Sequence, residues 1–232
     1  MIYAISDLHL SLRGDKPMDV FGGNWLGYTE AIKNNWKETV SSEDTVLLAG
    51  DLSWAIKLED AIADMKDFFG DLPGNKVIIR GNHDYWWNSY AKLNSALPVG
   101  VYALQNNCLR FGRDIVCGTR GWSLANENSS AEDKKIYNRE LIRLELTLQA
   151  MDKERKDGDR ATLMIHYPPM DVHSAETGFI ALINKYKPDA VVYGHLHGRD
   201  AWARVTSYIG GIPYFLTSCD LVGNKLIKIY KD

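Results

Sequence analysis

Three short clusters of histidine and acidic residues stand out in this sequence: DLH at 7–9, GNHD at 81–84 and GHLH at 194–197. Asp51 and His166 add an isolated carboxylate and an isolated imidazole. Together these residues offer oxygen and nitrogen donors without a thiolate, a set that suits manganese, iron, zinc or nickel better than calcium. Because one metal site uses three or four protein ligands, we expect two metals that share a carboxylate.

The GNHD cluster has a simpler explanation that covers only half of it. Gly81 and Asn82 tolerate left-handed backbone and often end strands, so turn chemistry accounts for both. It leaves His83 and Asp84 without a role. A chemical function is therefore needed to explain the second half of the motif.

Each donor follows a short apolar run that is typical of a buried strand. The five runs are MIYAIS, DTVLLAG, NKVIIRG, ATLMIH and DAVVYGH. They are aliphatic or β-branched without clean alternation, as in strands of a sheet that is covered by helices. Because ligands of open α/β sheets bind at the carboxyl edge of the strands, we expect all five donor groups to meet at that edge.

The segments between these runs predict helices and hairpins. Apolar residues recur at helical spacing in four segments: 29–40, 58–69, 131–152 and 177–186. Ser129 and Glu132 match a capping box for the third helix. Residues 99–123 and 203–230 read as strand, turn, strand, with RFGRDI and LVGNKL as hairpin turns. The mixture predicts a single α/β domain over residues 1–232, with a mixed sheet or two stacked sheets flanked by helices.

Composition and charge argue against several classes of protein. The net charge of −3 and the sequence pI near 6.1 make non-specific nucleic-acid binding unexpected. The three cysteines form no CxxC pair, which fits the reduced cytoplasm that we expect for this protein. No run of 18 apolar residues and no basic leader is present, so we expect no membrane partner.

The motifs resemble those of the calcineurin-like metallophosphoesterase superfamily, in the family's order and over residues 7–197. The resemblance implies a four-layer α/β/β/α sandwich of two mixed β-sheets flanked by helices. It also implies a small bacterial-type phosphohydrolase. Such an enzyme would cleave phosphoester bonds, here phosphodiester bonds of a small molecule, with a hydroxide activated by two metals.

The resemblance also gives each motif residue a role. Seven residues would hold two divalent metals: Asp7, His9 and His197 the first, Asn82, His166 and His195 the second, and Asp51 both. We expect manganese, with iron, zinc and nickel as alternatives. His83 would face the phosphate or the leaving group as a catalytic residue, and Asp84 would orient the His83 ring through a hydrogen bond.

Other functions stay open. Asp51 is followed by LSWA, whereas protein Ser/Thr phosphatases carry Asp-Arg-Gly shortly after the equivalent position, so that subclass is disfavoured. A nuclease is an alternative that the size and charge of the chain disfavour. A non-catalytic metal-binding scaffold of the same fold is another, although it would not need every ligand and His83. The oligomeric state and the substrate are left open.

The long loop 11–28, directly after the first motif, is rich in glycine and aromatic residues. Long loops in compact domains are often functional. We expect at least one of its rings to line a substrate pocket, with Phe21 and Trp25 as candidates, and to favour a compact diester with an aryl group or a base. Trp86 is expected in the core. His173, outside every motif, is expected to be structural.

Overall fold

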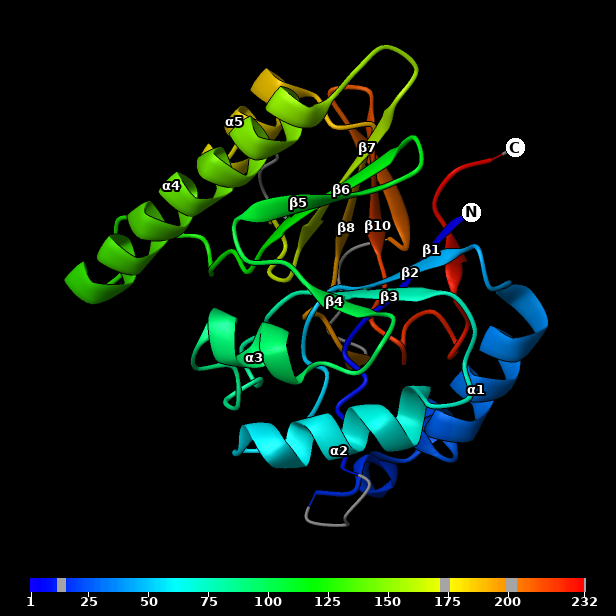
Figure 1. Ribbon diagram of the computed structural model, residues 1–232. Coiled ribbons are helices and arrows are strands. Elements are labelled where there is room, and N and C mark those ends of the chain that lie inside the picture. Colours follow the sequence, from blue (N-terminus) through cyan, green and yellow to red (C-terminus); the bar gives the residue numbers. More distant parts are fainter. Residues whose placement is uncertain (12–15, 172–175, 199–203, 232) are drawn as a thin grey trace.

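The computed structural model, which describes residues 1–11, 16–171, 176–198 and 204–231, contains two β-sheets (Figure 1). The first sheet has the spatial order β11 (Ile227–Lys228), β1 (Ile2–Ile5), β2 (Thr45–Leu48), β3 (Asn75–Ile78), β4 (Val101–Ala103). Strands β1 to β4 run parallel, and β11 pairs antiparallel with β1. Every residue of β1 and β2 is buried, which explains why these apolar runs show no alternation.

The second sheet is also mixed. Its spatial order is β5 (Asn107–Phe111), β6 (Asp114–Thr119), β7 (Arg160–Ile165), β8 (Ala190–Tyr193), β10 (Ile212–Leu216), β9 (Thr206–Ile209). The four inner strands run parallel, and the edge strands β5 and β9 are antiparallel to their neighbours. The RFGRDI turn joins β5 to β6 as a hairpin, with Gly112 at a φ of +62°.

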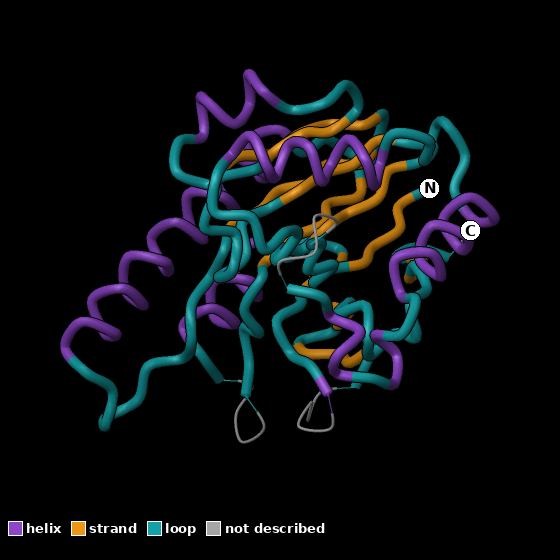
Figure 2. The backbone as a smooth tube through the Cα atoms, turned by 90° about the horizontal axis from the view of Figure 1, so that it is seen from below, coloured by secondary structure: helices purple, strands orange, loops and turns teal. Residues whose placement is uncertain are grey.

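Helices cover the outer faces of both sheets. The first sheet is covered by α1 (Tyr28–Thr39), α2 (Leu58–Phe69) and α3 (Tyr90–Ala96), and the second by α4 (Ala131–Glu154) and α5 (Gly178–Tyr186). The view in Figure 2 shows the strands inside and the helices outside. This confirms the predicted four-layer α/β/β/α sandwich. Among the described residues, none of the helices combines the length and the apolar composition that a membrane span requires.

An apolar core lies in each of the three spaces between layers. The layer between the sheets contains Ile2 and Leu47 from the first sheet and Val116 and Met164 from the second. Trp36 of α1 and Leu148 of α4 belong to the two outer cores. Full burial of such a side chain contributes about 1.5–3 kcal/mol, so the three cores hold the strand ends in fixed positions.

The LVGNKL segment is not a hairpin turn between neighbouring strands, as the sequence had predicted. The strand before it, β10, belongs to the second sheet, and the strand after it, β11, belongs to the first. The segment therefore carries the chain from one sheet to the other. The hairpin in this region lies earlier, between β9 and β10, where Gly210 and Gly211 have positive φ.

One local detail also differs from the sequence prediction, and another is confirmed. The cap of α4 is Ser130, whose hydroxyl accepts the Asp133 N–H, so the predicted Ser129–Glu132 box is wrong by one residue. Trp86 is 1% exposed, which confirms its place in the core. It precedes α3, however, because that helix begins at Tyr90 with Ser89 as its cap. His173 lies outside the described residues.

Candidate metal centre

The loops that follow the parallel strands are joined by backbone hydrogen bonds. The Asp7 N–H donates to the Gly50 carbonyl (3.0 Å), which links the loops after β1 and β2. The Gly194 N–H donates to the His166 carbonyl (3.1 Å), which links the loops after β8 and β7. The His195 N–H donates to Asp7 Oδ1 (3.1 Å), which links the loops of the two sheets, so the predicted donors of both sheets meet at one edge.

One group of donors contains Asp7, His9 and His197. Their ligand atoms all lie within 4.8 Å of one another. His197 Nε2 is 3.4 Å from Asp7 Oδ1 and 3.3 Å from His9 Nε2. One carboxylate oxygen and two imidazole nitrogens therefore face a common point.

A second group contains Asp7, Asp51 and His166, again with ligand atoms within 4.8 Å. Asp51 Oδ2 lies between two imidazoles, 3.6 Å from His166 Nε2 and 3.8 Å from His9 Nε2. Because His9 belongs to the first group and His166 to the second, the Asp51 carboxylate is close to both.

The remaining two predicted ligands adjoin the second group. Asn82 Oδ1 is 2.8 Å from His166 Nε2 and 2.8 Å from His195 Nδ1. The structure thus brings all seven predicted ligand residues together. Their division between two metals is part of the function proposed below.

Glycines make this close approach sterically feasible. A Cβ at Gly81 would collide with the carboxylate and the amide of Asp51. A Cβ at Gly50, where φ is +98°, would lie 2.5 Å from His166 Nδ1. The glycines of the GD and GNHD motifs are therefore needed for packing one loop against the next.

Four of the predicted ligands adopt left-handed backbone. The φ angles of Asp7, His9, Asp51 and His195 are 58°, 45°, 52° and 72°. Such angles are uncommon for residues other than glycine and cluster at functional sites.

The electrostatics of the cluster fit a cation. Burial and, to a smaller extent, the nearby Asp7 carboxylate raise the pKa of Asp51 to about 8. Burial lowers the pKa of His9 to about 3 and that of His195 to about 4. A divalent cation would offset the repulsion between the carboxylates and accept lone pairs from neutral imidazoles, so the residues present fit a metal.

Asp220 is a site residue that the sequence reasoning missed. Its Oδ1 accepts a hydrogen bond from His197 Nδ1 (2.9 Å), and its Oδ2 accepts the Gly198 N–H (2.9 Å). Burial lowers the pKa of His197, but the hydrogen bonds to Asp220 and Asp7 raise it to about 10. Asp220 follows β10, which is parallel to β8, so the strand-end rule could have found it.

Asp84 does not orient the His83 ring, and this prediction is wrong. Its two oxygens accept backbone N–H groups of the Asp51 loop and of its own turn: Asp51, Leu52, Ser53 and Gly81, at 2.7–3.3 Å. His83 Nδ1 has no hydrogen-bond partner among the described residues. Asp84 is fully buried and therefore fixes the backbone that presents Asp51.

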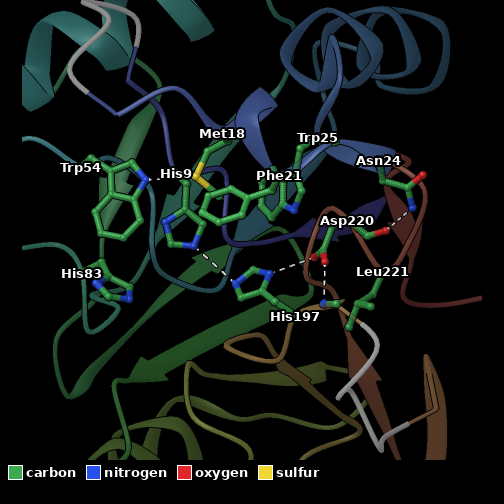
Figure 3. Close-up of a pocket in the computed structure, with 13 residues that line it drawn as sticks. His9, Met18, Phe21, Asn24, Trp25, Trp54, His83, His197, Asp220 and Leu221 are labelled. Carbon is green, nitrogen blue, oxygen red and sulfur yellow. Dashed lines mark hydrogen bonds and ion pairs between the residues drawn. The ribbon is translucent and has the colours of Figure 1, made fainter.

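His83 lies beside the cluster rather than in it. Its backbone N–H donates to Asp51 Oδ1 (2.8 Å), and its ring packs 4.4 Å from the Trp54 ring and 5.6 Å from the His9 ring. Burial and the nearby His166 lower the pKa of the His83 imidazole. Its side chain lines the cavity above the cluster (Figure 3).

That cavity has a volume of about 830 Å³ and reaches His9, His83 and His197. Phe21 and Trp25, from the short helices η1 (Met18–Phe21) and η2 (Gly23–Trp25), form its outer wall (Figure 3). Phe21 is 71% exposed, whereas Trp25 is 8% exposed and packs against the ring of Tyr28. Of the two predicted substrate-binding rings, Phe21 therefore borders the cavity as an exposed side chain and Trp25 as a buried one.

Trp54 forms a further wall of the cavity. Its ring stacks on His9 with a centroid distance of 4.8 Å and an interplanar angle of 22°. Trp87, in contrast, is buried, and its Nε1–H donates to Gln105 Oε1 (2.8 Å). Of these two rings outside the loop, Trp54 thus lines the cavity beside the candidate ligand His9.

Comparison with known proteins identifies both a family and a fold. The sequence model of the family described as calcineurin-like phosphoesterase matches residues 1–199. No curated protein matches the chain. Among solved structures, a protein of unknown function from Aquifex aeolicus is similar with a TM-score of 0.50 and 16% identity, over 98% of this chain and 94% of that one. GAP50, the anchor in the inner membrane complex of Plasmodium, is similar with a TM-score of 0.51 and 13% identity, over 94% and 71%. At such identities the similarity establishes the fold alone.

Proposed function

Because the chain belongs to the calcineurin-like phosphoesterase family, we propose that it is a metal-dependent phosphohydrolase that cleaves phosphodiester bonds of a small molecule. The observation that carries this proposal is the meeting of two donor groups through Asp7, with Asp51 between the imidazoles of both. An arrangement with a shared carboxylate suits two ions better than one. The cavity above it supplies room for a substrate.

The seven donors would hold two divalent ions. Asp7, His9 and His197 would bind the first, Asn82, His166 and His195 the second, and Asp51 would bridge them. Manganese is the ion we propose, with iron, zinc and nickel as alternatives that the same oxygen and nitrogen donors accept. When bound, the ions would neutralise phosphoryl oxygens and supply an activated water.

His83 would act on the substrate directly. Its ring lines the cavity, and its lowered pKa keeps the imidazole neutral near pH 7. A neutral imidazole can donate a hydrogen bond to a phosphoryl oxygen, and protonation of the leaving alkoxide would proceed from the imidazolium form. General acid catalysis of this kind is worth roughly 10²–10⁴-fold in rate. Asp84 would contribute by holding the turns that carry His83 and Asp51.

The substrate would be a compact diester with a flat group. The aromatic side chains of Phe21, Trp25 and Trp54 border the cavity and can pack against a base or an aryl ring. A cavity of about 830 Å³ has the size that small-molecule sites have. Phosphoproteins and duplex DNA would be poor substrates.

A substrate panel tests this proposal. The full-length chain, with and without added Mn²⁺, would be assayed on an aryl phosphodiester, an aryl phosphomonoester, a cyclic nucleotide, a phosphopeptide and duplex DNA. We expect Mn²⁺-dependent hydrolysis with the highest kcat/KM on a small diester, and loss of that activity in Asp51→Asn. Stoichiometric metal without turnover of any phosphoester would instead favour the non-catalytic scaffold.

A further inference from the structure

A second cavity, of about 330 Å³, lies behind the loops of the metal centre. Four arginines and one glutamate contribute to its lining: Arg80, Arg120, Arg139, Arg143 and Glu140. Arg80 directly precedes the GNHD motif. The Arg120 carbonyl accepts the N–H groups of His166 and Tyr167, at 3.0 and 3.1 Å. This arginine cavity therefore adjoins two of the loops that carry the proposed ligands. None of those ligands is among the described residues that line the cavity.

The charges in the arginine cavity do not balance. Glu140 is fully buried, and its Oε1 lies 2.7 Å from Arg143, 3.4 Å from Arg139 and 3.7 Å from Arg120. This single carboxylate thus pairs with three guanidinium groups, and Arg80 adds a fourth to the lining, which leaves a surplus of positive charge.

Arg80 carries part of this surplus. Its Nε is buried and has no hydrogen-bond partner among the described residues. A buried donor without an acceptor is costly, and a guanidinium has no acceptor capacity of its own. An incoming acceptor oxygen would remove this cost.

The neutral residues of the arginine cavity also present donors. Gln105 Oε1 is already bonded to the Trp87 indole (2.8 Å), and Asn106 Oδ1 accepts the Thr119 hydroxyl (3.0 Å). The amide NH₂ groups of both side chains have no recorded acceptor in the described structure and can donate to a ligand. One acceptor, Glu140 Oε2, is buried and has no partner within the described parts of the chain. A ligand for this cavity therefore needs several acceptor oxygens and, at one position, a hydroxyl.

We propose that the arginine cavity binds a phosphate group, separately from the metal centre. A hydrogen phosphate has three acceptor oxygens for guanidinium and amide donors, together with one hydroxyl that can donate to Glu140 Oε2. Arginine favours such planar, bidentate contacts with phosphate oxygens. The phosphate group that binds is either free inorganic phosphate or the phosphate of a nucleotide. The proposal does not depend on the reaction at the metal centre.

Calorimetric titration with inorganic phosphate tests the site. The full-length chain would be titrated as purified and again after chelator treatment, with the fold checked by circular dichroism. Chelation removes phosphate binding to metals, so the site that persists is the arginine cavity. We expect binding to one site after chelation, with a Kd that rises about tenfold or more in Arg80→Gln and in Arg143→Gln.

Arg113→Gln is the matched control, because Arg113 is exposed on the turn of the β5–β6 hairpin and should leave the Kd unchanged. A parallel titration with adenosine diphosphate separates the two sources. Tighter binding of phosphate supports a free anion, and tighter binding of the nucleotide supports a phosphate of a larger ligand. The proposal fails if the chelated chain binds no phosphate. It also fails if the folded Arg80→Gln and Arg143→Gln variants bind as tightly as wild type, or if Arg113→Gln weakens binding equally.

Discussion

The metal centre and the outer wall of its cavity are built in opposite ways. Asp7, His9 and Asp51 are at most 3% exposed and follow strands packed on both faces. Phe21 is 71% exposed at the end of a four-residue 3₁₀ helix. The candidate ligands thus lie in loops directly after buried strands, while the wall that would meet the rest of a substrate lies on the long loop before α1. This difference implies that changes in the wall should alter substrate preference at little cost to folding.

The largest loss of bound metal is expected when Asp51, the proposed bridging carboxylate, is replaced. Asp51→Asn should lower occupancy of both metal sites, because Asp51 Oδ2 lies close to imidazoles of each group. Removal of groups that only support a ligand costs about 10–100-fold in metal affinity, so loss of a bridging ligand should cost more than that. Asn82→Ala should mainly empty the second site. Elemental analysis after defined metal loading measures both.

Asp67→Asn is the control for this experiment, since it removes an equal charge from the exposed face of α2. Full metal content in Asp51→Asn would contradict the bridging role. It would also weaken the distinction between the buried candidate ligands and the exposed wall of the cavity.

His83→Ala should have the next largest effect, and on rate rather than on metal. We expect metal content close to wild type, because the His83 side chain lies beside the donor groups, and a loss of roughly 10²–10⁴-fold in kcat. The loss should shrink on substrates with a nitrophenolate leaving group, which needs little protonation. A loss of equal size for all leaving groups would assign His83 to charge stabilisation instead of proton transfer.

Asp220→Ala should weaken metal binding without removing a ligand. Asp220 fixes the His197 ring through Nδ1, and loss of such a partner lowers metal affinity about 10–100-fold. Asp220→Asn retains an acceptor oxygen and should recover part of the affinity. Metal titration of the three proteins measures this series. Equal affinities in all three would show that the orientation of His197 does not limit binding.

The smallest effect is expected at the wall. Phe21→Ala should lower kcat/KM for an aryl diester about fivefold, which corresponds to roughly 1 kcal/mol of lost stacking, with no change in Tm. Val20→Ala is the matched control, because Val20 is also 71% exposed but does not line the cavity. Trp25→Ala is a poorer test, since Trp25 is buried and its loss should lower stability. If Phe21→Ala and Val20→Ala behave alike, the wall does not contact the substrate.

The sequence predicts which side chains meet at this edge of the molecule because a single rule covers most of them. Short apolar runs identify parallel strands, and parallel strands place whatever follows them at the same edge. Applied to the run before Asp220, the rule would also have included that residue. Asp220 was missed because residues 203–230 were interpreted as a hairpin within one sheet. In the structure the chain passes here from β10 of the second sheet to β11 of the first.

The partners of Asp84 could not be predicted in the same way. His83 and Asp84 are adjacent in sequence, which suggested a contact between their side chains. The chain turns at this point, and the Tyr85 N–H donates to the His83 carbonyl (2.8 Å). Asp84 instead meets N–H groups of residues 51–53, more than 30 positions earlier in the chain. Such long-range backbone contacts leave no periodic signal in the sequence.

The proposed ligands come from both sheets, and this has a thermodynamic consequence. Asp7 and Asp51 follow strands of the first sheet, whereas His166 and His195 follow strands of the second. An ion that binds only the folded chain raises the free energy of unfolding by about 2.7 kcal/mol when its concentration is 100 times its Kd. Because the ion would contact both sheets, neither sheet could unfold and keep it. Metal binding would therefore couple the two halves of the sandwich into one cooperative unit.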